Sequence, residues 1–205
     1  MSNSLTLGQV TPDLRRSLES AYLGHSIYTF KRGHTVPLHQ GEVWLVCRGL
    51  VQLNTVDQQG FDILTGFAGS GMPFGLPLTT LNPYRALALS DVHLLRFTLT
   101  EIERSPELGS KLFAQIGKRL QQSEAIITLI SQKRIEDRLR ELLLLLKKEA
   151  GQPVPGGVKI NIRLTHQHLA TAINSTRVTV TRVLKQLQQE GWLTIDKDRF
   201  IILCQ

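Results

Sequence analysis

The sequence predicts an α+β protein: an antiparallel barrel or roll of short strands, then one long helix, then a small domain of helices that ends in a β-hairpin. Three observations predict this class. Short alternating segments separated by glycine fill residues 26–100, apolar residues at spacings of three and four follow Pro106, and two helical patterns joined by an asparagine occupy residues 165–190.

Residues 26–100 alternate between apolar and polar positions in short segments, as antiparallel strands do. The expected strands cover residues 27–31, 42–47, 50–55, 63–67 and 86–97. Glycine lies between or at the ends of these segments, for example at Gly49 and Gly75, where a turn needs a positive φ or a close backbone approach. We therefore expect these residues to form an antiparallel barrel or roll.

Pro106 suits the first turn of a helix, and Ser105 suits its N-cap. Along this helix a narrow apolar seam follows spacings of three and four: Phe113, Ile116, Leu120, Ser123, Ile127 and Ile130. Such a seam is typical of a coiled coil between two chains, whereas a helix that packs only on its own domain needs a broader apolar stripe. We expect a dimerisation helix over residues 106–131 and a homodimer, with packing inside one chain as the alternative.

The C-terminal part begins after a predicted hinge at residues 131–133. A helix over residues 134–150, a break over the glycine- and proline-rich residues 151–157 and a short strand over residues 158–164 follow. Thr165 is the expected N-cap of the next helix, which buries Leu169, Ala170 and Ile173. Asn174 stands where the chain turns with a positive φ, a conformation that few residues other than glycine tolerate.

A second, longer helix follows, with Ser175 or Thr176 as its cap and Gly191 at its end. Its expected inward face consists of Val180, Val183, Leu184 and Leu187. Residues 192–195 and 199–203 are expected to pair as a hairpin. A helix pair joined by a tight turn and followed by such a hairpin is a winged helix-turn-helix, which we place at residues 132–205.

The N-terminal half of the second helix carries side chains that suit double-stranded DNA. Arg177 can donate two hydrogen bonds to guanine, and Val178 can contact a thymine methyl group. The expected DNA-binding residues are Thr165, His166, Gln167, Ser175, Thr176, Arg177, Val178, Thr179, Thr181, Arg182 and Lys185. Residues 131–205 contain 13 Lys/Arg and 7 Asp/Glu, so they carry +6 of the net charge of +7, as a polyanion-binding domain would. A merely solvated basic surface is the alternative.

With these elements in this order, the whole chain resembles the Crp/Fnr family of transcription regulators. Residues 175–182 resemble the recognition helix of the NtcA subgroup, the nitrogen-control regulators of cyanobacteria. The resemblance implies that residues 1–105 form a β-roll, a jelly roll of the cupin type, that acts as an effector-sensing domain. It also implies transcription regulation, a palindromic operator with GTA and TAC half-sites, and RNA polymerase as a partner.

The same resemblance bears on the effector. Members that bind cyclic AMP hold its ribose with an acid and its phosphate with an Arg-Ser pair, but here Leu76 replaces the acid and Ala86 replaces the serine. We therefore expect no cyclic AMP. NtcA-like members bind 2-oxoglutarate, so the resemblance implies 2-oxoglutarate or another small anion as the effector. The residues that would form its site here are Phe74, Gly75, Leu76, Arg85, Arg119 and Glu124.

Two departures count against this effector site. Pro77 has no backbone N–H to offer an anion, and the loop before Tyr84 is shortened, which removes an arginine that the subgroup uses and for which Arg85 would substitute. The alternative is a ligand-binding sensor module with a vestigial pocket, whose DNA binding is constitutive or secondary.

Other function classes lack their signatures. No apolar run reaches the ~18–20 residues of a membrane span, and the first twenty residues show no secretory leader. Cys47 and Cys204 cannot form a cysteine framework, so we expect a cytoplasmic protein. The sequence shows no nucleophile–base pair, phosphate loop or metal cluster, which predicts neither an enzyme nor a bound metal or cofactor. Cys47 is expected to be a small buried hydrophobe.

Overall fold

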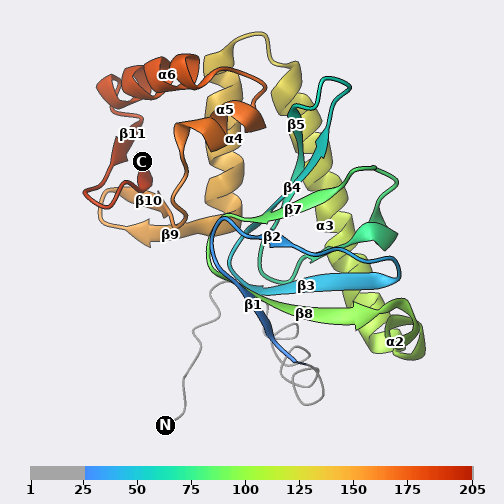
Figure 1. Ribbon diagram of the computed structural model, residues 1–205. Coiled ribbons are helices and arrows are strands. Elements are labelled where there is room, and N and C mark those ends of the chain that lie inside the picture. Colours follow the sequence, from blue (N-terminus) through green and yellow to red (C-terminus); the bar gives the residue numbers. More distant parts are fainter. Residues whose placement is uncertain (1–25, 205) are drawn as a thin grey trace. The chain divides into compact units, whose positions relative to one another are not determined.

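Antiparallel strands and helices make up residues 26–204, the part of the chain that the computed structural model describes (Figure 1). The elements in chain order are β1 (Tyr28–Phe30), β2 (Thr35–Val36), β3 (Glu42–Arg48), β4 (Val51–Val56), β5 (Asp62–Ala68), β6 (Pro73–Phe74), the 3-10 helix η1 (Leu76–Leu78), β7 (Arg85–Ala88), β8 (Val92–Thr98), α2 (Leu99–Arg104), α3 (Pro106–Ser131), α4 (Ile135–Ala150), β9 (Gly151–Val154), β10 (Gly157–Ile160), α5 (His166–Ala172), α6 (Arg177–Gln189), β11 (Leu193–Ile195) and β12 (Ile201–Cys204). The predicted α+β class is confirmed. The first twenty residues, with the expected absence of a leader, lie outside the described part.

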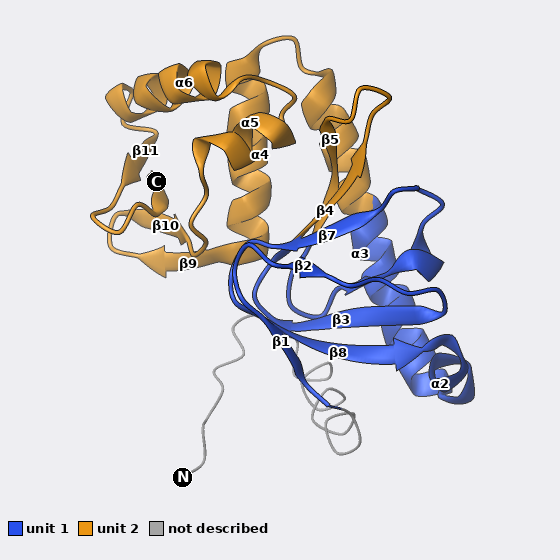
Figure 2. Ribbon diagram, viewed as in Figure 1, with its two compact units in different colours: residues 1–51, 68–120 blue, residues 52–67, 121–205 orange. Residues whose placement is uncertain are grey.

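The chain divides into two compact units (Figure 2). Unit 1 comprises residues 1–51 and 68–120, and unit 2 comprises residues 52–67 and 121–205. Helix α3 is continuous and contributes its first part to unit 1 and its second part to unit 2. None of the helices in residues 26–204 is long and apolar enough to cross a membrane.

Unit 1 is built on an antiparallel sheet with the strand order β1-β8-β3-β6, and β2 pairs with β7 beside it. A buried cluster joins this sheet to the start of α3: Leu45, Cys47, Leu95, Phe97 and Leu112. The thiol-bearing Cys47 is only 1% exposed, which confirms the expectation of a small buried hydrophobe. The cluster anchors the first turns of α3 on the sheet.

The strand expected over residues 86–97 is wrong in one respect, because two strands, β7 and β8, occupy this segment. Between them the Ser90 hydroxyl accepts the N–H of Leu50 at 3.1 Å. The Asp91 carboxylate accepts the N–H of Arg32 at 3.0 Å and the Nζ of Lys31 at 2.9 Å. These side-chain acceptors stabilise a turn that an alternation of apolar residues does not reveal.

Unit 2 contains the β4–β5 hairpin, the helices α4, α5 and α6, and an antiparallel sheet with the strand order β11-β12-β10-β9. The predicted helix over residues 134–150 is confirmed as α4, and its core face is fully buried: Leu139, Leu142, Leu143 and Leu146. Helix α4 ends at Ala150, as the predicted break over residues 151–157 requires, but the segment also contains a strand, β9, and a tight turn that the sequence did not indicate. Pro153 is tolerated there because β9 lies at the edge of the sheet.

The strand expected over residues 158–164 also differs from the structure. It ends at Ile160, and Ile162 nevertheless stays buried, at 3% exposed. The N–H of Ile162 donates to the carbonyl of Ile160 at 2.8 Å, and this tight turn takes the chain out of the ladder after Asn161. The segment therefore keeps its apolar pattern without keeping its strand.

Candidate nucleic-acid interface

Helix α5 starts where the sequence places its cap. The Thr165 hydroxyl accepts the N–H of His168 at 3.0 Å, and the His168 Nδ1 accepts the N–H of Thr165 at 3.4 Å. This reciprocal pair is a capping box in which histidine takes the place of the usual glutamate. Leu169, Ala170 and Ile173 are buried as predicted.

Helix α6 also follows its sequence signals. Asn174 has φ 52°, so it occupies the left-handed conformation expected at the turn. Thr176, one of the two predicted caps, accepts the N–H of Thr179 with its hydroxyl at 3.2 Å. The four residues of the predicted inward face are buried: Val180, Val183, Leu184 and Leu187. Together α5, the turn and α6 form a helix-turn-helix.

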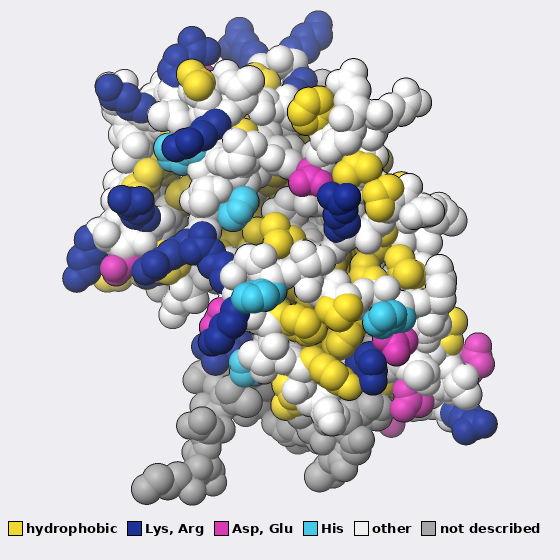
Figure 3. All heavy atoms as spheres, viewed as in Figure 1, with side chains coloured by type: hydrophobic (Ala, Val, Ile, Leu, Met, Phe, Trp, Pro, Cys, Tyr) yellow, Lys and Arg dark blue, Asp and Glu magenta, His cyan; other side chains and the backbone are white. Residues whose placement is uncertain are grey.

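The face of α6 opposite this core is open. Val178 is 80% exposed, although it is apolar. Among the expected DNA-binding residues, the exposed ones are Thr165, Gln167, Thr176, Arg177, Val178, Thr181, Arg182 and Lys185, and the half-buried ones are His166, Ser175 and Thr179. Figure 3 shows Lys and Arg side chains gathered over the part of unit 2 that carries α6 and the β11–β12 hairpin.

His166 has a structural partner inside the motif. Its Nδ1 lies 2.7 Å from the Thr181 Oγ1, and that hydroxyl donates to the carbonyl of Arg177 at 2.8 Å. A hydroxyl has one proton, so the imidazole Nδ1 is the donor to Thr181. His166 therefore ties α5 to the exposed face of α6.

Sequence reasoning missed a second tie, made by Arg138 of α4. Its Nε donates to the carbonyl of Gln132 at 2.8 Å, and its Nη1 donates to the carbonyl of Ile173 at 3.3 Å. The guanidinium thus joins the α3–α4 connection to the turn between α5 and α6. No local pattern signals this contact, because Arg138 and Ile173 lie 35 positions apart.

The β11–β12 hairpin is the predicted wing. The Asp196 Oδ1 accepts the N–H groups of Asp198 and Phe200, each at 2.9 Å, and Arg199 has φ 65°. The bond from Phe200 lowers the pKa of the Asp196 carboxyl, and so do the bond from Asp198 and the Lys159 ammonium, 3.5 Å away. A charged aspartate thus holds the wing turn.

Helix α3 has two faces. One faces the protein, with these residues buried: Leu112, Gln115, Gln122, Ile126 and Leu129. The other carries the predicted seam, on which Phe113 is 77%, Leu120 62% and Ile127 64% exposed. Packing within the chain therefore uses residues other than the seam.

The residues expected to form the effector site lie in different environments. Phe74 is fully buried in β6, and a Cβ on Gly75 would lie 2.5 Å from the carbonyl oxygen of Glu42. Leu76 opens η1 and is half-buried, whereas Arg85 and Glu124 are exposed.

Arg119 faces a buried tyrosine that sequence reasoning did not include. Its guanidinium hydrogen-bonds the Tyr84 hydroxyl; burial raises the pKa of Tyr84, and the charge of Arg119 offsets part of that rise. The Nη1 of Arg119 is buried without a protein hydrogen-bond partner. Most buried donors in folded proteins have a partner, so this one has unused capacity for a hydrogen bond.

Comparison with known proteins decides the family. Residues 137–205 match the family model of the Crp-like helix-turn-helix domain. The chain is 31% identical to the global nitrogen regulator of Synechocystis sp., over 98% of this chain and 95% of that protein. It is 33% identical to the global nitrogen regulator of Synechococcus elongatus, over 91% of this chain and 90% of that protein. The chain belongs to the Crp/Fnr family.

The solved structures agree with this membership. A transcriptional regulator of the CRP/FNR family from Thermus thermophilus superposes with a TM-score of 0.71 at 27% identity, over 88% of this chain and 94% of that one. This Crp/Fnr protein is accordingly a DNA-binding transcription regulator and not an enzyme, as its relatives are regulators. A further relative, from Haemophilus influenzae and 23% identical to this chain, is named as a cAMP-activated global transcriptional regulator.

Proposed function

We propose that this Crp/Fnr protein binds a palindromic duplex as a homodimer, with α6 of each chain in the major groove. The observation that carries the proposal is the N-terminal half of α6, where Arg177, Val178 and Arg182 are exposed above a buried apolar face. A recognition helix contacts base edges with this half. The similarity to global nitrogen regulators supports a role in nitrogen control. The resemblance of residues 175–182 to the recognition helix of the nitrogen-control subgroup implies GTA and TAC half-sites.

The dimer is proposed to form along the α3 seam. The most exposed seam residues are large and apolar, and they repeat at the spacing of a coiled coil. Within this proposal residues 1–105 are the sensor domain, residues 106–131 the dimerisation helix and residues 132–205 the DNA-binding domain. RNA polymerase is the proposed further partner of the DNA-bound dimer. The proposed cellular location is the cytoplasm.

Selection from a randomised duplex pool tests this function. We expect enrichment of an inverted repeat whose half-site centres lie about 10 base pairs apart, one helical turn. Sedimentation with the selected duplex should then give two chains per duplex. No enrichment, or a 23.0 kDa monomer on one half-site, would contradict the proposal.

The effector is proposed to be a small anion such as 2-oxoglutarate, and not cyclic AMP. Support comes from Arg119. Its guanidinium hydrogen-bonds the buried Tyr84 hydroxyl, but its Nη1 is buried and has no hydrogen-bond partner in the protein. Leu76 would face the 2′-hydroxyl of a cyclic nucleotide, and an unpaired buried polar group costs about 1–3 kcal/mol. Titration calorimetry should show binding of 2-oxoglutarate and none of cyclic AMP. Tight binding of cyclic AMP would overturn the proposed effector. No binding heat with either ligand would favour a vestigial pocket and constitutive DNA binding.

A further inference from the structure

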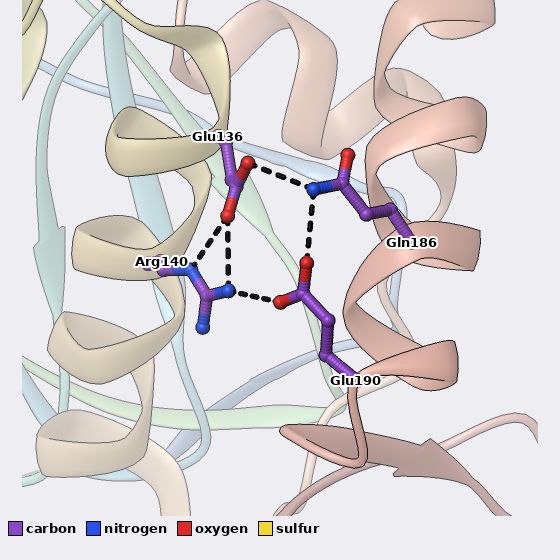
Figure 4. A network of polar contacts seen from close by, with 4 residues as sticks. All are labelled: Glu136, Arg140, Gln186 and Glu190. Atoms are coloured by element: carbon purple, nitrogen blue, oxygen red, sulfur yellow. Dashed lines mark hydrogen bonds and ion pairs between the residues drawn. The ribbon is translucent and has the colours of Figure 1, made fainter.

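Four polar side chains form a closed network between α4 and the C-terminal end of α6 (Figure 4). We call Glu136, Arg140, Gln186 and Glu190 the α4–α6 network. The Arg140 Nε and Nη2 donate to the Glu136 Oε1 at 3.1 and 2.9 Å, and the Nη2 also binds the Glu190 carboxylate. The Gln186 Nε2 closes the network, because it donates to Glu136 at 3.0 Å and to Glu190 at 2.9 Å.

The network extends to the wing. The Arg140 guanidinium carbon lies 4.9 Å from the centre of the Trp192 ring, in cation–π geometry. Trp192 directly precedes β11, so one guanidinium contacts α4, the last turn of α6 and the start of the hairpin. Arg140 also places a positive charge at the C-terminal end of α6. The helix dipole favours a cation there, whereas it disfavours the negative charge of the Glu190 carboxylate.

Stability alone is a weak reason for these contacts. The side chains of Arg140, Glu136 and Glu190 are 26%, 29% and 38% exposed, and partly exposed ion pairs contribute little to folding. The arrangement instead fixes geometry, since five bonds in a closed network leave α6 little freedom to rotate against α4. Helix α6 has 13 residues and is therefore about 20 Å long. A rotation of about 5° at its C-terminal end would move Arg177 by about 1.7 Å.

We propose that the α4–α6 network sets the angle at which α6 meets DNA, so that Arg140 and Glu190 are positioning residues for sequence discrimination. The inference rests on the proposed function, in which α6 contacts bases. A displacement of this size breaks a bidentate contact to a base while long, flexible side chains still reach phosphates. Loss of the network therefore lowers the preference for the selected site and spares binding to random DNA.

Two variants of the full chain test the proposal, because they change the charge in opposite directions. Arg140→Met removes a positive charge but keeps an apolar stem over Trp192, and Glu190→Ala removes a negative charge. The matched controls are Lys148→Met and Glu141→Ala, exposed positions on α4 outside the network. Affinity is measured for the duplex that the wild type selects and for a random duplex, at several salt concentrations.

A charge effect alone would weaken binding to random DNA in Arg140→Met and strengthen it in Glu190→Ala. The positioning role predicts instead that the ratio of random to selected Kd falls about tenfold in both network variants and stays unchanged in both controls. Arg140→Lys, which keeps the charge, should bind random DNA as the wild type does without restoring the full ratio. Thermal melting checks folding, and a smaller folded fraction lowers both affinities equally and leaves the ratio unchanged.

Two failures are distinguishable. If the wild type selects no sequence, the proposed function fails. If the wild type discriminates and both network variants keep its full ratio, the positioning role of the α4–α6 network is overturned.

Discussion

Single acceptor atoms hold several turns of this protein. The Asp196 Oδ1 accepts two backbone N–H groups in the wing, and the Asp57 Oδ1 does the same for Gln59 and Phe61 at the tip of the β4–β5 hairpin. Asp is suited to this task because its short side chain reaches backbone groups two to four residues ahead. In each turn the carboxylate therefore adds to the backbone bonds that close the hairpin, such as those from the N–H groups of Asp57 and Asp196.

The wing turn should consequently depend on pH. The pKa of Asp196 is lower in the folded protein than in the unfolded chain, mainly because of the bond from Phe200. The charged Asp196 carboxylate thus contributes its full stabilisation above the pKa of Asp in the unfolded chain, about 3.9. This stabilisation is lost as the pH falls through the lower pKa of Asp196 in the folded protein. Asp196→Asn should flatten the dependence of the unfolding free energy on pH in the acid range, measured by urea unfolding.

The neighbouring Asp198→Asn is the control for this prediction, because the two backbone bonds end on Asp196. An Asp196→Asn curve that runs parallel to the wild type from about pH 6 to the acid limit would show that the wing turn does not use this charge.

At the scale of elements, the helix-turn-helix could be predicted in detail and the roll only in outline. Thr165, Asn174 and Thr176 act through bonds or backbone angles within a few residues, so the sequence alone marks the motif. Strands β2 and β6 have two residues each and leave no pattern. Helix α2 was also missed, although Thr98 and Glu101 form the capping box that would have marked it.

The turn between α5 and α6 is open to a direct test. Asn174 is exposed at φ 52°, so its replacement changes backbone strain and little else. Asn174→Ala should lower the unfolding free energy by about 1 kcal/mol, since a Cβ-bearing residue without a local hydrogen bond is disfavoured there. Asn174→Gly should be close to neutral. Denaturant unfolding of both variants distinguishes this from a side-chain role, for which Gly would be as costly as Ala.

At the scale of the whole molecule, the contacts that integrate the protein lie beyond prediction from one sequence. The α4–α6 network joins residues 50 positions apart, and Arg119 contacts Tyr84 from 35 positions away (119 − 84). Neither periodicity nor capping extends that far. The seam on α3 was predictable as a pattern, but only the burial of the neighbouring face and the exposure of the seam side chains show that the chain itself leaves the seam uncovered.

Dimer formation should therefore respond to a single charge on the seam. Leu120 is 62% exposed within one chain, so Leu120→Glu should leave the fold intact and place a charge in the apolar interface. Sedimentation should show a shift from twice the 23.0 kDa chain mass to the chain mass. Ala125→Glu adds the same charge at an exposed position off the seam and should remain dimeric. A dimeric Leu120→Glu would place the interface elsewhere.

The central claim is that the exposed N-terminal half of α6 determines which DNA sequence the protein binds. The most direct measurement compares Arg177→Ala and Lys185→Ala with the wild type on selected and random duplexes over a range of salt. Arg177→Ala should cost about 1–3 kcal/mol on the selected duplex and relax the preference at one guanine. Lys185→Ala should weaken binding to all duplexes alike and reduce the salt slope by about one. Equal losses on selected and random DNA for Arg177→Ala would contradict the claim.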